Sequence, residues 1–373
     1  MDAINTVIYF AHEWWNDFFH STHERMNNMS YDELDRIYLQ RKRFLFEEFG
    51  AFGFGEDKPV MDGKHVNSFV KWGMDIISYI LGAGLTAQEA GGYYVHPMDR
   101  ARLVALEPVD VAKTPFADWI LRKKSELIKH YGSVECVQIL ETSLNVATRI
   151  GGQDFYSYMC LDKPFARHML RVIAETTVLA YAFFTQHFTL SNVNLSNCSV
   201  NHISAAMYEE LCLPNDVYLA EATKPLFPDM LSHVVMHNCD LPADRFVEHY
   251  AKVPHVYRLE ASNKSDIRLC RRIMPYAQFC ELINPVDMDC LSPEELRETL
   301  ICNIKAGARE LIFWSIDPRM TPERVRGMLE AIDAACATCG MAAKYDVYPF
   351  NFDEIEWSFP RWMGSKKYCI NNP

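Results

Sequence analysis

The sequence predicts an α/β protein built on a (β/α)8 barrel, the TIM barrel, with a helical extension at its N-terminus. Seven β-rich runs follow one another after about residue 130, at 135–142, 187–195, 230–238, 255–260, 278–284, 310–316 and 342–350. Helical segments separate most of them. This alternation is typical of a parallel sheet with crossover helices. A closed barrel is our prediction, and an open doubly wound sheet is the alternative.

The first 80 residues lack this alternation. The segment from Ser30 to Phe49 begins with a capping residue, carries acidic residues early and repeats apolar positions at helical spacing, which predicts an amphipathic helix. We interpret residues 1–80 as a helical extension packed on a barrel of residues 81–373. The aromatic N-terminus is expected to pack there as a helix, and a docking or homodimer surface is the alternative for its residues Trp14, Trp15, Phe18 and Phe19.

Composition excludes several classes of protein. A net charge of −12 argues against nucleic-acid binding, which needs clustered Lys and Arg. No uncharged apolar run is long enough to predict a membrane span, and no basic segment precedes an apolar one as in a secretory signal. Twelve cysteines in a chain of 373 residues without such a signal indicate reduced thiols. We therefore expect a cytoplasmic protein.

The segment MLSHVVMHNCDLP carries the clearest chemical signal. In a strand, His237 and Cys239 share one face and lie at the carboxyl end, where barrel enzymes gather their functional residues. An imidazole nitrogen and a thiolate sulfur are good zinc ligands. The alternative is a pair of packed core residues, because buried cysteine is common.

Polar residues also follow the neighbouring predicted strands. Glu260 ends the next strand and is expected to supply an oxygen ligand or to carry a proton; a surface salt bridge is the alternative. The other candidates for the cleft are Asn192, Asn194, Asn197, Asn284, Asp287, Ser315 and Asp317. Among these, Asn192 is expected to orient a polar substrate and Asp317 to act at the cleft rim. Cys336 and Cys339 form a CxxC without a partner pair, so we interpret them as packed thiols.

Together these blocks resemble the uroporphyrinogen decarboxylase superfamily. The resemblance covers roughly residues 85–345 and follows the order LSNVNLSNCSVNHISAAMYEELCLP, VVMHNCD, VYRLE, QFCELINPVD and LIFWSIDPRMTPERV. It implies a (β/α)8 barrel. The Arg-rich N-terminal block and the late Gly-His-Gly of the decarboxylases are absent, so the chain looks closer to the methylcobalamin:coenzyme M type of methyltransferase. In that branch His-x-Cys and a distant third Cys bind zinc. His237 and Cys239 match, whereas Ser315 stands near the third position.

The resemblance implies a zinc-dependent methyltransferase that acts with a corrinoid. The predicted metal ligands are His237, Cys239 and Glu260, and the predicted catalytic residues are Glu260, Asn192 and Asp317. The chain lacks the Asp-x-His-x-x-Gly segment of corrinoid-binding modules, so a separate protein is expected to bring the cobalamin. The missing third Cys favours demethylation of a methoxylated or methylated compound over methylation of a thiol. The alternatives are a metal-independent decarboxylase or lyase acting on a carboxylated substrate, and a non-enzymatic module that binds a corrinoid protein.

Overall fold

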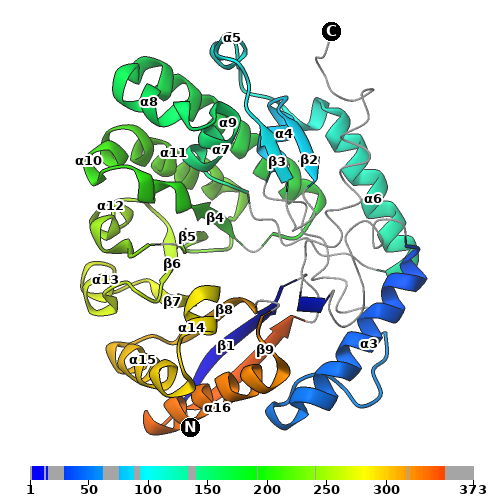
Figure 1. The fold of residues 1–373 in the computed structure, drawn as a ribbon. Coiled ribbons are helices and arrows are strands. Elements are labelled where there is room, and N and C mark those ends of the chain that lie inside the picture. Colours follow the sequence, from blue (N-terminus) through cyan, green and yellow to red (C-terminus); the bar gives the residue numbers. More distant parts are fainter. Residues whose placement is uncertain are drawn as a thin grey trace. The chain divides into compact units, whose positions relative to one another are not determined.

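The protein is described from a computed structural model (Figure 1). The structure describes residues 2–11, 14–15, 29–61, 75–87, 93–132, 140–190, 192–239, 241–316 and 319–348. The chain divides into two compact units. The first comprises residues 1–62, 239–244 and 258–354, and the second comprises residues 63–238, 245–257 and 355–373.

The main sheet has seven strands in the order β4-β5-β6-β7-β8-β1-β9. Its members are β1 (Ala3–Phe10), β4 (Val193–Ser196), β5 (Val234–Asn238), β6 (Val256–Ser262), β7 (Gln278–Ile283), β8 (Glu310–Ile316) and β9 (Ala342–Tyr348). The registers of β4–β5, β6–β7, β7–β8, β8–β1 and β1–β9 are parallel. The predicted α/β class is confirmed, and six of the seven predicted runs overlap a strand of this sheet. A separate pair, β2 (Gly84–Ala87) and β3 (Tyr93–His96), is antiparallel.

The seventh predicted run, 135–142, lies mostly outside the described residues. Within its described end, Glu141 forms a parallel bridge with Ser196 of β4. This bridge continues the parallel pairing beyond β4. Closure of the sheet through residues 133–139 stays a prediction.

Strand β1 corrects our interpretation of the N-terminus. Residues 3–10 form no helical extension but a strand between β8 and β9, with Ile8 opposite both Phe313 and Val347. In Figure 1, β1 and β9 run side by side in the same direction. The segment was not predicted as a strand because its partners lie about 300 residues or more later in the sequence, so nothing in its neighbourhood indicates them.

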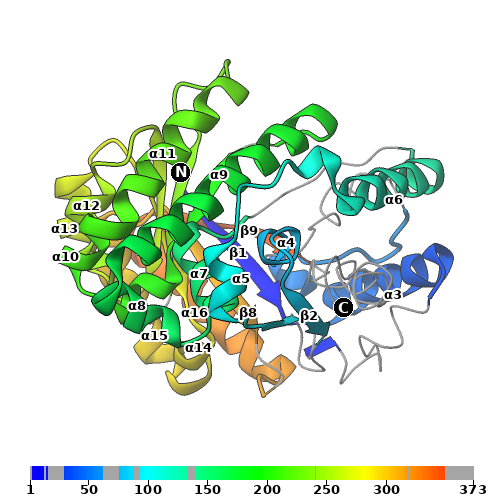
Figure 2. The ribbon, with the colours of Figure 1, turned by 90° about the horizontal axis from the view of Figure 1, so that it is seen from above.

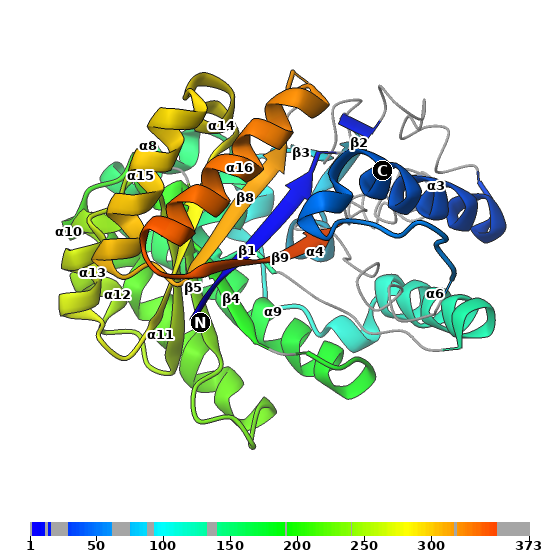
Figure 3. The same cartoon turned by 90° about the horizontal axis from the view of Figure 1, so that it is seen from below.

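Helices fill most of the intervening sequence. They are α3 (Tyr31–Phe49), α4 (Ile76–Ile80), α5 (Arg100–Val104), α6 (Pro115–Tyr131), α7 (Ser143–Gly151), α8 (Asp154–Leu161), α9 (Lys163–His187), α10 (Ala205–Met207), α11 (Leu213–Thr223), α12 (Val247–Tyr250), α13 (Ile267–Ile273), α14 (Pro285–Cys290), α15 (Pro293–Ala306) and α16 (Pro322–Thr338). In the second unit, α9 packs beside α7 and α11 (Figure 2). In the first unit, α16 packs against α15 and β9 (Figure 3). Among the described helices, none is long and apolar enough to cross a membrane.

The predicted helix after Ser30 is confirmed as α3. Ser30 and Glu33 form a capping box, in which the Ser30 N–H donates to Glu33 Oε2 over 2.8 Å. The buried face of α3 ends in Phe49, whose ring stacks 6.1 Å from that of Phe10 in β1. This contact anchors α3 to the strand.

The N-terminal tryptophans belong to the core. Trp14 and Trp15 are fully buried, and the Trp14 ring lies 4.6 Å from the Phe10 ring, between centroids. Trp14 Nε1 also donates a hydrogen bond to the Met320 carbonyl over 2.8 Å. Trp14 and Trp15 are therefore no docking or homodimer surface, which corrects that alternative. The other two aromatic residues of the patch, Phe18 and Phe19, lie outside the described residues.

A buried acid on β7 gives the fold a testable pH dependence. Glu281 is 0% exposed; Oε1 accepts a hydrogen bond from Asn303, and Oε2 has no hydrogen-bond partner among the described residues. Burial raises the pKa of Glu281 from 4.5 to about 8, although the Asn303 bond opposes the shift. The folded protein therefore keeps a proton that the unfolded chain releases above pH 4.5. The contribution of Glu281 to stability therefore falls as pH rises from 4.5 to 8.

Glu281→Gln, which mimics the protonated acid, should remove this loss. We expect the free energy of unfolding of the variant, relative to wild type, to rise between pH 5 and pH 8 by up to about 4 kcal/mol. Urea denaturation at the two pH values measures it. Glu298→Gln, at an exposed position of α15, is the control and should show no such rise. Parallel pH profiles of wild type and Glu281→Gln would show that this carboxyl group does not titrate as described.

Candidate metal centre

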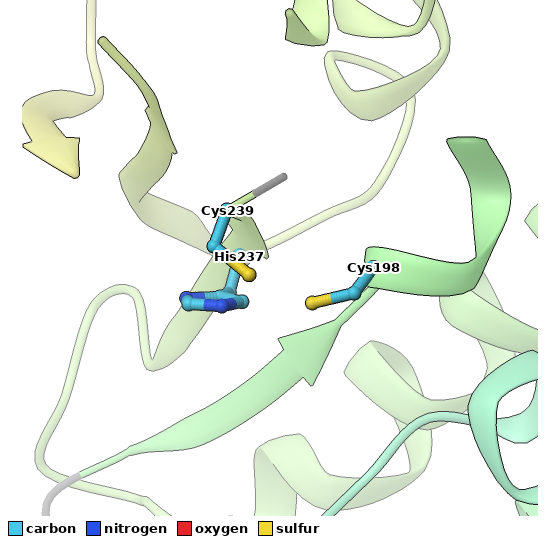
Figure 4. Close-up of side chains that lie close together, drawn as sticks. All are labelled: Cys198, His237 and Cys239. Atoms are coloured by element: carbon cyan, nitrogen blue, oxygen red, sulfur yellow. The ribbon is translucent and has the colours of Figure 1, made fainter. Parts of the chain in front are cut away.

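Two neighbouring strand ends bring three potential metal ligands together. Parallel pairing sets Ser196 of β4 opposite His237 of β5, and the Asn197 N–H donates to the His237 carbonyl over 2.8 Å. Cys198 follows immediately and Cys239 comes two residues after His237. Figure 4 shows the Cys198 thiol pointing towards His237 and Cys239. One ligand atom from each of the three residues lies within 4.8 Å of the other two.

The donor set fits zinc. One imidazole nitrogen and two sulfurs are ligands of structural and catalytic zinc sites. Two thiolate ligands of a tetrahedral zinc ion lie about 3.8 Å apart, since each Zn–S bond is about 2.3 Å. The present separation of the two sulfurs exceeds this by at most about 1 Å, which small side-chain rotations can close. All three residues are partly exposed, so a fourth ligand position can be reached by a small molecule.

Glu260, our third predicted ligand, is not a member of this group. Its carboxylate pairs with Arg258 in the same strand, with 2.8 Å between Arg258 Nε and Glu260 Oε1, and Arg258 also pairs with Glu310. The third member of the group is Cys198 and not Glu260. The sequence carries one signal for Cys198, which we did not predict as a ligand: the dipeptide Asn-Cys occurs both at 197–198 and at 238–239.

The predicted catalytic residues are distributed differently from our expectation. Asn192 precedes the amino end of β4, about 13 Å of strand away from Ser196 at the carboxyl end, so it is not placed at this edge of the sheet. The predicted run of residues 187–195 includes Asn192. Strand β4 begins only at Val193, so Asn192 lies before the strand and not within it. Asp317 lies outside the described residues, and its role stays a prediction.

Other polar candidates have structural partners. Asn284 caps α14, and its side chain donates to Asp287 Oδ2 over 2.9 Å. Asn194 Oδ1 accepts a hydrogen bond from the Ser196 hydroxyl over 2.7 Å. Cys336, predicted as a packed thiol, is buried within α16, and Cys339, which follows that helix, is partly exposed.

A buried acid lies beside Cys198. Glu141 is 3% exposed; its Oε1 accepts a hydrogen bond from Arg149 over 2.7 Å, and its Oε2 has no partner among the described residues. Arg149 also pairs with the buried Asp75. Burial raises the pKa of Glu141 to about 8, against the opposing charge of Arg149, while Asp75 and Cys198 contribute to the rise. A buried carboxyl group with a raised pKa therefore adjoins the candidate ligand group. The sequence predicted a β-rich run at 135–142, but Glu141 was not recognised there as a functional residue, because only the folded chain brings it to Cys198.

Comparisons with known proteins show the fold. No protein-family model matches the chain, and no curated protein sequence matches it. A solved structure described as a methyltransferase from Methanosarcina mazei superposes with a TM-score of 0.60 at 12% identity, over 89% of this chain and 94% of that chain. Another, from Listeria monocytogenes and described as "Putative Vitamin-B12 Independent Methionine Synthase", has a TM-score of 0.43 at 14% identity, over 90% and 96%. The first shows a shared TIM-barrel-like α/β fold.

The donor set makes a prediction about metal content. Wild-type protein dialysed against a zinc buffer should hold about one zinc ion per chain. Cys198→Ser should lose most of it at the same free zinc concentration, because a hydroxyl group is a far weaker ligand than a thiolate. Elemental analysis measures the ratio, and Cys290→Ser, at an exposed cysteine, is the control. Full zinc occupancy in Cys198→Ser would exclude Cys198 as a ligand.

Proposed function

We propose that this protein is a zinc-dependent methyltransferase that moves a methyl group between a small substrate and a corrinoid carried by a separate protein. The observation that carries the proposal is the group formed by Cys198, His237 and Cys239 at the carboxyl ends of β4 and β5. This edge is where barrel enzymes hold their active sites. The fold shared with a structure described as a methyltransferase supports the same class.

Bound zinc would supply a Lewis acid that stabilises negative charge on a sulfur, oxygen or nitrogen atom of the substrate. Three protein ligands leave one position of a tetrahedron for that atom. The two thiolates together balance the charge of the ion, and His237 adds a neutral donor. Cys198 thus restores the count of two thiols that the resemblance implies.

Cys198 also changes two expectations drawn from the sequence. The serine near the family's third cysteine was the reason to favour demethylation over thiol methylation, and that reason is gone, so either direction fits the proposal. The same serine motivated the metal-independent decarboxylase or lyase. With three ligands in one group, that alternative has no observation of its own in its favour. The corrinoid partner and the cytoplasmic location stay predictions.

A methyl-transfer assay tests the proposal in both directions. Zinc-loaded protein is mixed with cob(I)alamin and a panel of methoxylated and methylated compounds, or with methylcobalamin and a panel of small thiols. Conversion between the two cobalamins is followed by absorbance. We expect turnover with wild type and a loss of at least about 100-fold in His237→Ala, because an imidazole ligand is removed. Cys290→Ser should remain active.

The same assay separates the alternatives. Release of carbon dioxide from a carboxylated substrate by metal-free protein would replace the proposal with a lyase. Zinc binding without turnover in either direction, also when a corrinoid protein is present, would favour a binding module. Equal turnover by wild type and His237→Ala would exclude the site.

A further inference from the structure

The dipeptide Asn-Cys occurs at the ends of two neighbouring strands. Asn197 and Cys198 follow β4, and Asn238, the last residue of β5, precedes Cys239. The two asparagines are 1% and 0% exposed, whereas both cysteines are partly exposed. Buried amides must be hydrogen-bonded to be tolerated. The bonds of these two asparagines determine how each Cys backbone is held.

Asn197 is bonded on three sides. Its N–H donates to the carbonyl of His237 over 2.8 Å. Its side-chain Nδ2 donates to Asp216 Oδ2 over 2.8 Å, and its Oδ1 lies 3.1 Å from the Thr142 hydroxyl, which shares its proton between Asn197 and the Ser196 carbonyl. The backbone of the residue before Cys198 is therefore hydrogen-bonded to the predicted ligand His237, and its side chain is hydrogen-bonded to the buried Asp216.

Asp216 is itself fixed from a second direction. The hydroxyl of Tyr208 donates to the same Oδ2 atom over 2.6 Å. Burial raises the pKa of Asp216 to about 6, so at neutral pH it accepts both bonds as a carboxylate, which makes them strong. Tyr208 opens a turn of π-helix, Tyr208–Cys212, between α10 and α11. Such turns are rare and frequently occur at functional sites.

Asn238 belongs to the same network. Its Nδ2 donates to the Tyr250 hydroxyl over 3.0 Å, and its Oδ1 accepts from Asn201 over 3.2 Å. The Tyr250 ring meets the Tyr208 ring edge to face, with 5.6 Å between centroids. The two tyrosines are fully buried. One connected set of buried side chains therefore lies behind both Asn-Cys dipeptides.

We propose that Asn197 and Asn238 are positioning residues, which hold the two thiols at a spacing suited to metal binding through the network of Asp216, Tyr208 and Tyr250. The inference rests on the proposed metal centre and adds to it the residues that set its affinity. Ligands held in place before the metal arrives lose less freedom when it binds. Partners behind the ligands typically account for 10–100-fold in metal affinity.

Cobalt(II) titration of the metal-free, full-length protein tests this, since thiolate-to-cobalt charge-transfer absorption reports both affinity and thiolate ligation. We expect Asn197→Ala and Asn238→Ala to bind cobalt about 10–100-fold more weakly than wild type. Asn215→Ala is the matched control: Asn215 is a buried asparagine beside Asp216 whose Nδ2 donates to the Leu211 carbonyl, within its own helical turn and away from both cysteines. It should lose stability but keep wild-type cobalt affinity.

Exchange of the two partners provides a rescue. Asn197→Asp alone places its new carboxyl group next to that of Asp216, where the hydrogen bond is lost, and it should weaken cobalt binding. Adding Asp216→Asn reverses donor and acceptor, restores the hydrogen bond, and should recover most of the affinity. If Asn238→Ala does not fold, Tyr250→Phe replaces it, because this change removes only the hydroxyl group that Asn238 contacts.

Two results would overturn the inference while leaving the proposed function intact: wild-type cobalt affinity in the folded variants, or an equal loss in Asn215→Ala. A wild-type protein that binds neither cobalt nor zinc would overturn both.

Discussion

The hydrogen bond from the Asn197 N–H to the His237 carbonyl continues the parallel register of β4 and β5 beyond the last residue of β4. A slip of one residue in this register would turn His237 to the opposite face of the sheet and separate it from Cys198. Because β4 has only four residues, pairing with β5 alone holds this register weakly. On the other side of β4, Glu141 bridges to Ser196 and the Thr142 hydroxyl donates to the Ser196 carbonyl, so the strand end is fixed from both sides.

The surroundings of this strand end contain several buried polar side chains. Glu141 and Asp216 are carboxylic acids with at most 3% exposure, and each is bonded by neighbouring donors. Burying such groups costs stability unless their partners are in place, and apolar side chains of similar size would cost less. Buried polar groups that cost stability are expected mainly at functional sites. Glu141 and Asp216 lie beside the strand ends that carry the three candidate ligands, whereas Glu281 lies on β7.

The strands and long helices were predictable because their patterns are local. The run 310–316 and the helix after Ser30 carry their apolar spacing and capping residues within a few positions. His237 and Cys239 were also predictable, since alternation along a single strand places them together. Cys198 was not, because 38 residues separate it from His237, and only the pairing of β4 with β5 makes them neighbours. Strand β1 was missed for the same reason, and Asn192 was misplaced because strand boundaries depend on tertiary pairing.

The origin of the ligands distinguishes this site from the one that the resemblance implied. There the third cysteine comes from a strand far along the chain; here the three candidate ligands among the described residues lie between positions 198 and 239, in the segment that leads from the end of β4 through α11 to the end of β5. A site built within one such unit depends on a single strand register and on the helix that packs behind it. Residues on later strands can then vary with the substrate without disturbing the metal ligands. The serine at position 315 is consistent with this arrangement, because Cys198 already supplies a second thiol to the candidate group.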